Sequence, residues 1–170
     1  MLNLRIERDE SPESPREWDN LGTMACWHRR YNLGDEQPEE SPTDFVASLP
    51  KGTVVLPLYL YDHSGITMRT TAFSCPWDSG QVGLIYATPE RIRKEYGCKR
   101  ITKATIEKVN KRLVGEVETY DQFLTGDVWY YSVEDEEGKV LDSCGGFYGE
   151  QDTRQEGEAA LKALQEKATV

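Results

Sequence analysis

The spacing of apolar residues between Ile106 and Leu124 is the sequence feature that most restricts the fold. Apolar side chains recur there at steps of 3, 4, 4, 3 and 4 residues, which places them on one face of an α-helix. We expect this helix to begin near Thr102 and to end at Gly126. Basic residues occupy its first half and acidic residues its second, which opposes the helix dipole at both ends. Something other than helix stability therefore favours this charge arrangement. The apolar stripe consists of Ile106, Val109, Leu113, Val117, Tyr120 and Leu124.

Six segments have the alternating or β-branched pattern of strands. The turns around His63-Ser-Gly65 and Asp135-Glu-Glu-Gly138 connect two pairs of them as hairpins. Meandering antiparallel pairing follows. The predicted strands cover residues 2–7, 53–61, 66–71, 81–87, 127–133 and 139–147.

Three shorter helices are predicted from capping signals. Ser41-Pro42 and Thr88-Pro89 each place a capping side chain before a proline at the first helical position. Thr153-Arg-Gln-Glu156 is a capping box for a last helix that is expected to fray at its end. The sequence thus predicts an α+β fold: an antiparallel meandering sheet of about five to six strands, packed by one long and two or three shorter helices.

The length of 170 residues is typical of one domain. We expect a single α+β domain over 1–170, with flexible acidic loops near 9–16 and 35–42. No apolar run approaches the roughly 20 residues that cross a bilayer, and the N-terminus lacks a basic start followed by an apolar stretch. A cytoplasmic protein without membrane contact is predicted.

Cysteine and glycine patterns give no sign of a metal or a cofactor. The cysteines form no Cys-x-x-Cys pair, and neither histidine has zinc-site spacing, so we expect reduced, buried thiols and no structural zinc. The glycine-bearing segments 75–80 and 142–149 match neither a phosphate loop nor a dinucleotide fingerprint, so no cofactor is expected. Trp77 and Tyr148 in these segments are predicted to pack at strand edges; the alternative is that they belong to a ligand cage. The four cysteines are Cys26, Cys75, Cys98 and Cys144.

The formal charge of −10 is unevenly distributed along the chain. Residues 91–112 contain nine basic and two acidic residues, a local charge of +7. Residues 116–137 contain eight acidic residues and no Lys or Arg. Such polarity can orient a charged partner and speed encounter; the alternative is an ordinary solvated surface.

The segment from Cys26 to Tyr31 concentrates a thiol, an imidazole, two guanidinium groups and two aromatic rings in six residues. Arg29 and Arg30 are suited to holding a phosphate or carboxylate while Trp27 or Tyr31 stacks on a base. In the structural alternative, the arginines pair with acids such as Asp19 or Asp35, and Trp27 fills the core.

A second set of reactive residues surrounds His63. Cys75, His63 and Asp78 contain the parts of a thiol nucleophile, its base and an orienting acid. The same region offers possible metal ligands, although no spacing favours that reading over a turn acid and surface histidines. Those ligands would be His28, His63, Asp62 and Asp78.

Four segments carry a resemblance to other proteins: 19–35, 56–65, 75–83 and 142–149. In these segments, across most of residues 17–149, the chain resembles an uncharacterised family of small acidic accessory proteins of bacteriophages and conjugative elements. The resemblance implies a bacterial host cell and a protein that acts by binding host defence or other host machinery. It implies no catalytic residues.

The leading hypothesis is therefore a non-enzymatic mobile-element protein that binds and inhibits a host factor, of the anti-CRISPR or anti-restriction type. A dense acidic face can occupy the basic groove that a nucleic-acid-handling complex provides for phosphates. One alternative is nucleic-acid binding by the basic 91–112 patch, and another is a small hydrolase built on His28, His63 and Cys75. The predicted binding residues are Trp27, His28, Arg29, Arg30, Glu116, Glu118, Asp121, Asp127, Glu134, Asp135, Glu136 and Glu137.

Overall fold

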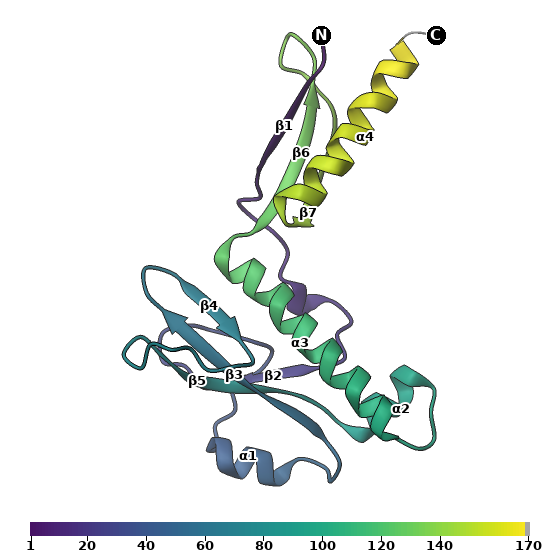
Figure 1. Ribbon diagram of the computed structural model, residues 1–170. Helices are drawn as coiled ribbons and strands as arrows, with labels where there is room; N and C mark the ends of the chain where they lie inside the picture. Colours follow the sequence, from purple (N-terminus) through teal and green to yellow (C-terminus); the bar gives the residue numbers. More distant parts are fainter. Residues whose placement is uncertain (169–170) are drawn as a thin grey trace. The chain divides into compact units, whose positions relative to one another are not determined.

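The strands fall into two antiparallel sheets, each belonging to a different unit of the chain (Figure 1). The computed structural model describes residues 1–168. The central unit is Pro15–Asp121, and the terminal unit combines Met1–Ser14 with Gln122–Val170. The described residues form four α-helices and seven strands, which confirms the α+β class. The predicted single sheet of five to six strands is wrong, because the strands divide between the two units. That the chain behaves as one domain over 1–170 stays a prediction.

The sheet of the central unit has the strand order β2-β5-β3-β4, with antiparallel neighbours. β3 and β4 form the predicted hairpin. The sequence did not predict β2, because its residues Thr-Met-Ala-Cys do not alternate between apolar and polar. Glu36 adds one parallel bridge at the β2 edge, to Ala25. The strands are β2 (Thr23–Cys26), β3 (Val54–Asp62), β4 (Ile66–Arg69) and β5 (Ser79–Ala87).

Helices cover both faces of this sheet (Figure 1). The long helix α3 (Lys103–Thr125) confirms the predicted apolar stripe in its middle, although Ile106 is 39% exposed. α3 approaches the sheet so closely that a Cβ on Gly22 would lie 2.5 Å from Leu113 and 2.7 Å from Ile85. On the opposite face, Phe45 of α1 (Pro42–Ser48) packs with Leu84. The buried side chains of α3 are Val109, Leu113, Val117 and Tyr120.

The predicted helix caps of the central unit are confirmed. Ser41 accepts a hydrogen bond from the Asp44 amide at the start of α1. Thr88 caps α2 (Pro89–Tyr96) in the same way, and Gly97 ends α2 with a φ of 59°. A single 3₁₀ turn covers Pro15–Glu17.

The terminal unit is a three-stranded antiparallel sheet with one helix packed along it. The predicted hairpin around 135–138 is confirmed between β6 and β7. A Cβ on Gly157 would lie 2.8 Å from Leu4 Cδ1, so this glycine lets the helix approach the sheet closely. The elements are β1 (Asn3–Arg8), β6 (Val128–Glu134), β7 (Val140–Tyr148) and α4 (Glu150–Ala168).

The predicted capping box of the last helix is wrong. α4 begins at Glu150, so Thr153 lies inside its first turns. Thr153 is fully buried and donates its hydroxyl hydrogen bond to the Gly149 carbonyl, at 2.9 Å, which is the back-bonding that threonine makes within helices. The expected fraying concerns the end of the chain, where residues 169–170 lie outside the described part.

Candidate functional site

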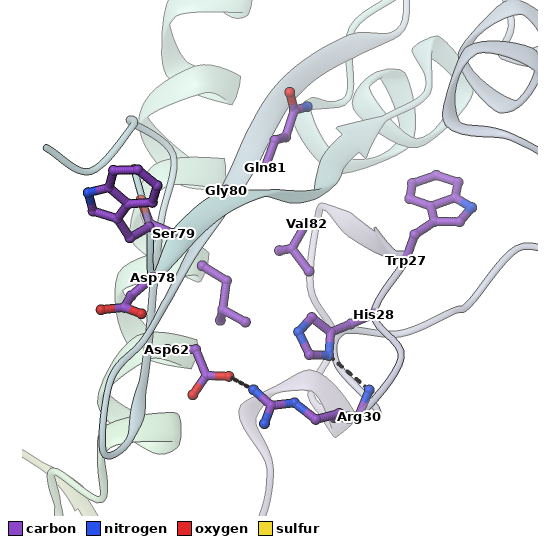
Figure 2. A pocket seen from close by; sticks show the side chains of 11 residues that line it. Trp27, His28, Arg30, Asp62, Asp78, Ser79, Gly80, Gln81 and Val82 are labelled. Carbon is purple, nitrogen blue, oxygen red and sulfur yellow. Dashed lines mark hydrogen bonds and ion pairs between the residues drawn. The ribbon is translucent and has the colours of Figure 1, made fainter. Parts of the chain in front are cut away.

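A polar cavity of about 320 Å³ lies in the central unit, where the loop after β2 meets the hairpin end of β3 and the start of β5 (Figure 2). It brings together three of the predicted binding residues, Trp27, His28 and Arg30, and both acids of the alternative metal hypothesis. Arg29 is exposed and does not line it. The lining residues are Trp27, His28, Arg30, Leu60, Asp62, Trp77, Asp78, Ser79, Gly80, Gln81 and Val82.

The imidazole of His28 is fixed by backbone hydrogen bonds. Its Nδ1 accepts from the amides of Arg30 and Tyr31, each at 3.1 Å (Figure 2). Its ring stacks on Tyr31 with the centroids 5.0 Å apart. Because Nδ1 is an acceptor in both bonds, the neutral ring carries its proton on Nε2 and can donate one further hydrogen bond from there.

Arg30 and Asp62 form an ion pair across the cavity (Figure 2). The Arg30 guanidinium also lies over the Tyr31 ring, 5.4 Å from its centroid, and the Tyr31 hydroxyl donates to Asp62 at 3.4 Å. The guanidinium therefore already has an anionic partner. The structural alternative expected the arginines of 26–31 to pair with acids such as Asp19 or Asp35. Arg30 instead pairs with Asp62.

Asp78 connects the cavity to the second histidine. His63 Nδ1 lies 3.1 Å from Asp78 Oδ2, and the Asp62 amide donates to the Asp78 carbonyl at 2.8 Å, which holds the two acids on adjacent backbone segments. Cys75 is not a lining residue; its carbonyl accepts a hydrogen bond from Ser79. Of the residues in the hydrolase hypothesis, His28 and Asp78 line the cavity, whereas His63 and Cys75 contact its lining residues Asp78 and Ser79 from outside.

Trp27 packs within the central unit, whereas one sequence hypothesis had its ring stack on a base. Its indole N–H donates to the Glu40 carbonyl at 2.9 Å, and its ring meets Phe45 edge-on with centroids 5.5 Å apart. It also lines a second, smaller cavity of about 220 Å³ beside α1. The structural alternative, in which Trp27 fills the core, therefore describes its contacts.

Trp77 differs from its prediction. It does not pack at a strand edge: it is 91% exposed beside the cavity. The residue follows Pro76 and precedes Asp78 in a turn, so the sequence showed a turn but gave no signal of which way the ring would face.

Metal binding finds no support in the geometry. Within residues 1–168, no group of three or more His, Cys, Asp and Glu side chains is placed to hold a metal ion.

The cysteines differ in their surroundings. Burial and the Asp35 carboxylate raise the pKa of the Cys26 thiol to about 12, whereas Cys144 is exposed.

Glu116 has an internal role. Its carboxylate accepts the amide hydrogens of Leu21 at 2.8 Å and Gly22 at 3.1 Å. It also lies 3.4 Å from Arg16 and 3.6 Å from Arg112. With 10% of its side chain exposed, Glu116 ties the 15–22 segment to α3 and presents little charge to a partner.

Asp121 is engaged in the same way. Its Oδ1 accepts from the Thr67 hydroxyl at 2.6 Å and from the Met68 amide at 2.7 Å, so it holds β4 against α3. Glu118, between these two acids in sequence, is exposed.

Sequence reasoning missed Arg16. Only 6% of its side chain is exposed, and it pairs with Asp35 at 2.6 Å and donates to the Gly22 carbonyl at 2.7 Å. The Asp35 carboxylate also accepts the Met24 amide at 2.7 Å. Arg16 lies in the predicted 9–16 loop, whose sequence has no regular pattern, so no sequence signal indicated that this side chain would be buried.

The remaining predicted acids belong to the terminal unit. Asp127 accepts from the Trp129 indole at 2.7 Å and from Gln122 at 3.0 Å, and these bonds lower the pKa of its carboxyl. Asp135 closes the hairpin turn by accepting two backbone amides at 2.9 Å. The N-terminal ammonium pairs with Glu136 and lowers its pKa. Glu134 is half-buried, and Glu137 is exposed.

The units differ sharply in charge. The terminal unit has 15 acidic and six basic residues, a net −9, whereas the central unit has 15 acidic and 14 basic residues, a net −1. None of the 15 acids of the terminal unit is buried, and nine are exposed. The exposed ones are Glu10, Glu13, Glu136, Glu137, Glu150, Asp152, Glu156, Glu158 and Glu166.

The basic stretch 91–112 lies on α2, the following loop and the start of α3. Arg91 pairs with Asp19, and Arg112 pairs with Glu95. The other seven basic side chains are exposed: Arg93, Lys94, Lys99, Arg100, Lys103, Lys108 and Lys111.

Among residues 1–168, no helix combines the length and the apolar character that a membrane span requires. Comparison with protein-family models, with curated proteins and with solved structures gave no match.

Proposed function

We propose that the chain is a non-enzymatic binding protein whose terminal unit occupies a basic, nucleic-acid-binding surface of a partner protein. The observation that carries the proposal is the concentration of nearly all the net charge, −9 of −10, in that unit. The proposed site is therefore smaller than the predicted acidic stretch 116–137. Glu116 and Asp121 of the central unit drop out of it, because their carboxylates are engaged in internal contacts.

Surface charge of this density favours a basic partner. Exposed carboxylates steer association with a positive groove and raise the on-rate, and the attraction weakens as salt screens it. Grooves that bind nucleic acid are lined with Lys and Arg for the same reason. The partner class thus follows from charge complementarity.

The terminal unit also offers an apolar anchor beside its acids. β7 is an edge strand whose Val140 and Leu141 are 51% and 42% exposed. The acidic turn with Glu136 and Glu137 directly precedes this strand. Protein interfaces combine an apolar centre with a polar rim, and an open strand edge can accept a partner strand.

The resemblance to accessory proteins of mobile elements supplies the context for this chemistry. Its implied partner is a host complex that handles nucleic acid in defence. In that setting, an acidic unit acts as an inhibitor by competing with DNA or RNA for one groove.

A charge-neutralised variant tests the proposal. Glu137→Gln, Asp152→Asn, Glu156→Gln and Glu158→Gln together change the terminal unit from −9 to −5 at exposed positions. The assay is inhibition of DNA cleavage by a panel of purified RNA-guided and restriction nucleases. We expect the wild-type chain to inhibit at least one nuclease, with an affinity that falls steeply between 50 and 300 mM salt, and the variant to lose at least tenfold.

A control with the same total charge separates local from overall effects. It replaces Glu17, Glu39, Glu107 and Glu118, all exposed in the central unit, with Gln. This control should inhibit within about twofold of the wild type. Inhibition of no nuclease, or equal losses in the two variants, would show that the proposal is wrong.

The exposed basic residues of 91–112 favour a second candidate, direct nucleic-acid binding by the central unit. A gel shift with single- and double-stranded oligonucleotides at 50 mM salt tests it. A shift that disappears when Lys99, Arg100 and Lys103 are changed to Gln would support this candidate, and no shift would exclude it.

A further inference from the structure

We propose that the polar cavity of the central unit is a binding site for a neutral sugar ring, with Trp77 as the stacking surface. The proposal concerns a different unit from the acidic surface and stands without it.

The charges around the cavity argue against a phosphate-bearing ligand. Two carboxylates, Asp62 and Asp78, line it against one guanidinium, that of Arg30, which is already paired with Asp62. A phosphate placed there would meet more negative than positive charge. The expectation that Arg29 and Arg30 hold a phosphate stays a prediction that this cavity does not favour: Arg29 lies outside the lining, and Arg30 is paired with Asp62.

The hydrogen-bonding groups suit hydroxyls, each of which both donates and accepts. Asp62, Asp78 and Gln81 present acceptor oxygens, whereas the Nε2–H of His28 and the remaining N–H groups of Arg30 are donors. In Figure 2 the acceptors Asp62 and Asp78 lie on one side of the cavity, and the donors His28 and Arg30 lie on the other. Neighbouring hydroxyls of a sugar ring can bond to such ionised groups without carrying a charge themselves.

The aromatic surface fits the apolar face of the same ligand. An indole that is 91% exposed leaves a large apolar area in water, and it stands beside a cavity whose other lining is largely polar. A sugar ring has one C–H face to cover an indole and a rim of hydroxyls to meet polar groups. A nucleobase taken into a pocket is typically stacked between two aromatic or apolar side chains, whereas this cavity offers one strongly exposed ring beside its polar groups.

The test is isothermal titration of the full chain with D-glucose, D-galactose, D-mannose and N-acetyl-D-glucosamine, with adenosine and inorganic phosphate as competing classes. We expect at least one sugar to bind with a dissociation constant on the order of 1 mM, as suits a ligand of this size. Trp77→Ala and Asp78→Asn should each raise that constant at least tenfold.

Trp18→Ala is the matched control, since Trp18 is 47% exposed in the same unit but outside the cavity; it should leave binding within twofold. Circular dichroism of each variant confirms folding. The proposal is overturned if no sugar binds up to 20 mM, if adenosine or phosphate binds more tightly than every sugar, or if Trp77→Ala binds sugar as the wild type does.

Discussion

Replacing Glu116 with Ala should destabilise the central unit by about 3 kcal/mol. The substitution leaves the amides of Leu21 and Gly22, now bonded at 2.8 and 3.1 Å, without an acceptor. An unsatisfied buried amide costs about 1–3 kcal/mol, and for these two part-buried bonds we take the lower end, about 1 kcal/mol each. The loss of the Arg16 contact adds roughly 1 kcal/mol, less than a broken buried pair usually costs, because Arg16 keeps Asp35 at 2.6 Å.

Urea unfolding followed by tryptophan fluorescence measures this effect. With an m-value of about 2 kcal/mol/M, the midpoint should fall by roughly 1.5 M. Glu118→Ala removes the same charge from the same helix at an exposed position, and its midpoint should stay within about 0.25 M, since exposed substitutions rarely exceed 0.5 kcal/mol. Equal midpoints for the two variants would refute the assignment of Glu116 as an internal connector.

Three further predictions follow from local geometry. Gly83→Ala should cost about 2–3 kcal/mol in chemical denaturation, because its Cβ would meet the β2 backbone, whereas Gly80→Ala on the same strand, with nothing within 4 Å, should cost little. In a thiol-alkylation time course at pH 8, exposed Cys144 should react in the folded protein, and Cys26, with its pKa near 12, should react only after unfolding. Burial and a glutamate hydrogen bond raise the pKa of Tyr86 to about 12, so its contribution to stability should be complete below pH 10 and be lost between pH 10 and 12; Tyr86→Phe should have a shallower alkaline slope.

Local signals in the sequence were strong enough to predict most elements. The caps at Ser41 and Thr88 and the hairpin turn at 135–138 rest on hydrogen bonds within a few residues. The stripe from Val109 to Tyr120 shows in the spacing of apolar residues along one helix. Such patterns reflect backbone geometry that the chain fixes locally.

Features that depend on distant pairing could not be predicted. β2 forms because Cys26 and its neighbours meet β5, some 60 residues away, and its Thr-Met-Ala-Cys sequence has no alternation of its own. Thr153 looked like a cap, but β7 ends at Tyr148 and the helix already begins at Glu150, so Thr153 lies inside it.

The candidate sites, too, could be predicted from the sequence only in part. The density of reactive groups in 26–31 pointed to Trp27, His28 and Arg30, which line the cavity. Acid counting along the chain could not separate Glu116, held by two amides, from exposed Glu118 two residues later. Nor could it show that a unit built from both ends of the chain carries −9.

The central claim is that the acidic terminal unit and nucleic acid compete for one surface of the partner. The most direct test measures the dissociation constant between the chain and an inhibited nuclease at increasing concentrations of the nuclease's own DNA substrate, at fixed salt. Competition predicts that the apparent constant rises linearly with DNA concentration. A constant that does not change with DNA would contradict the account.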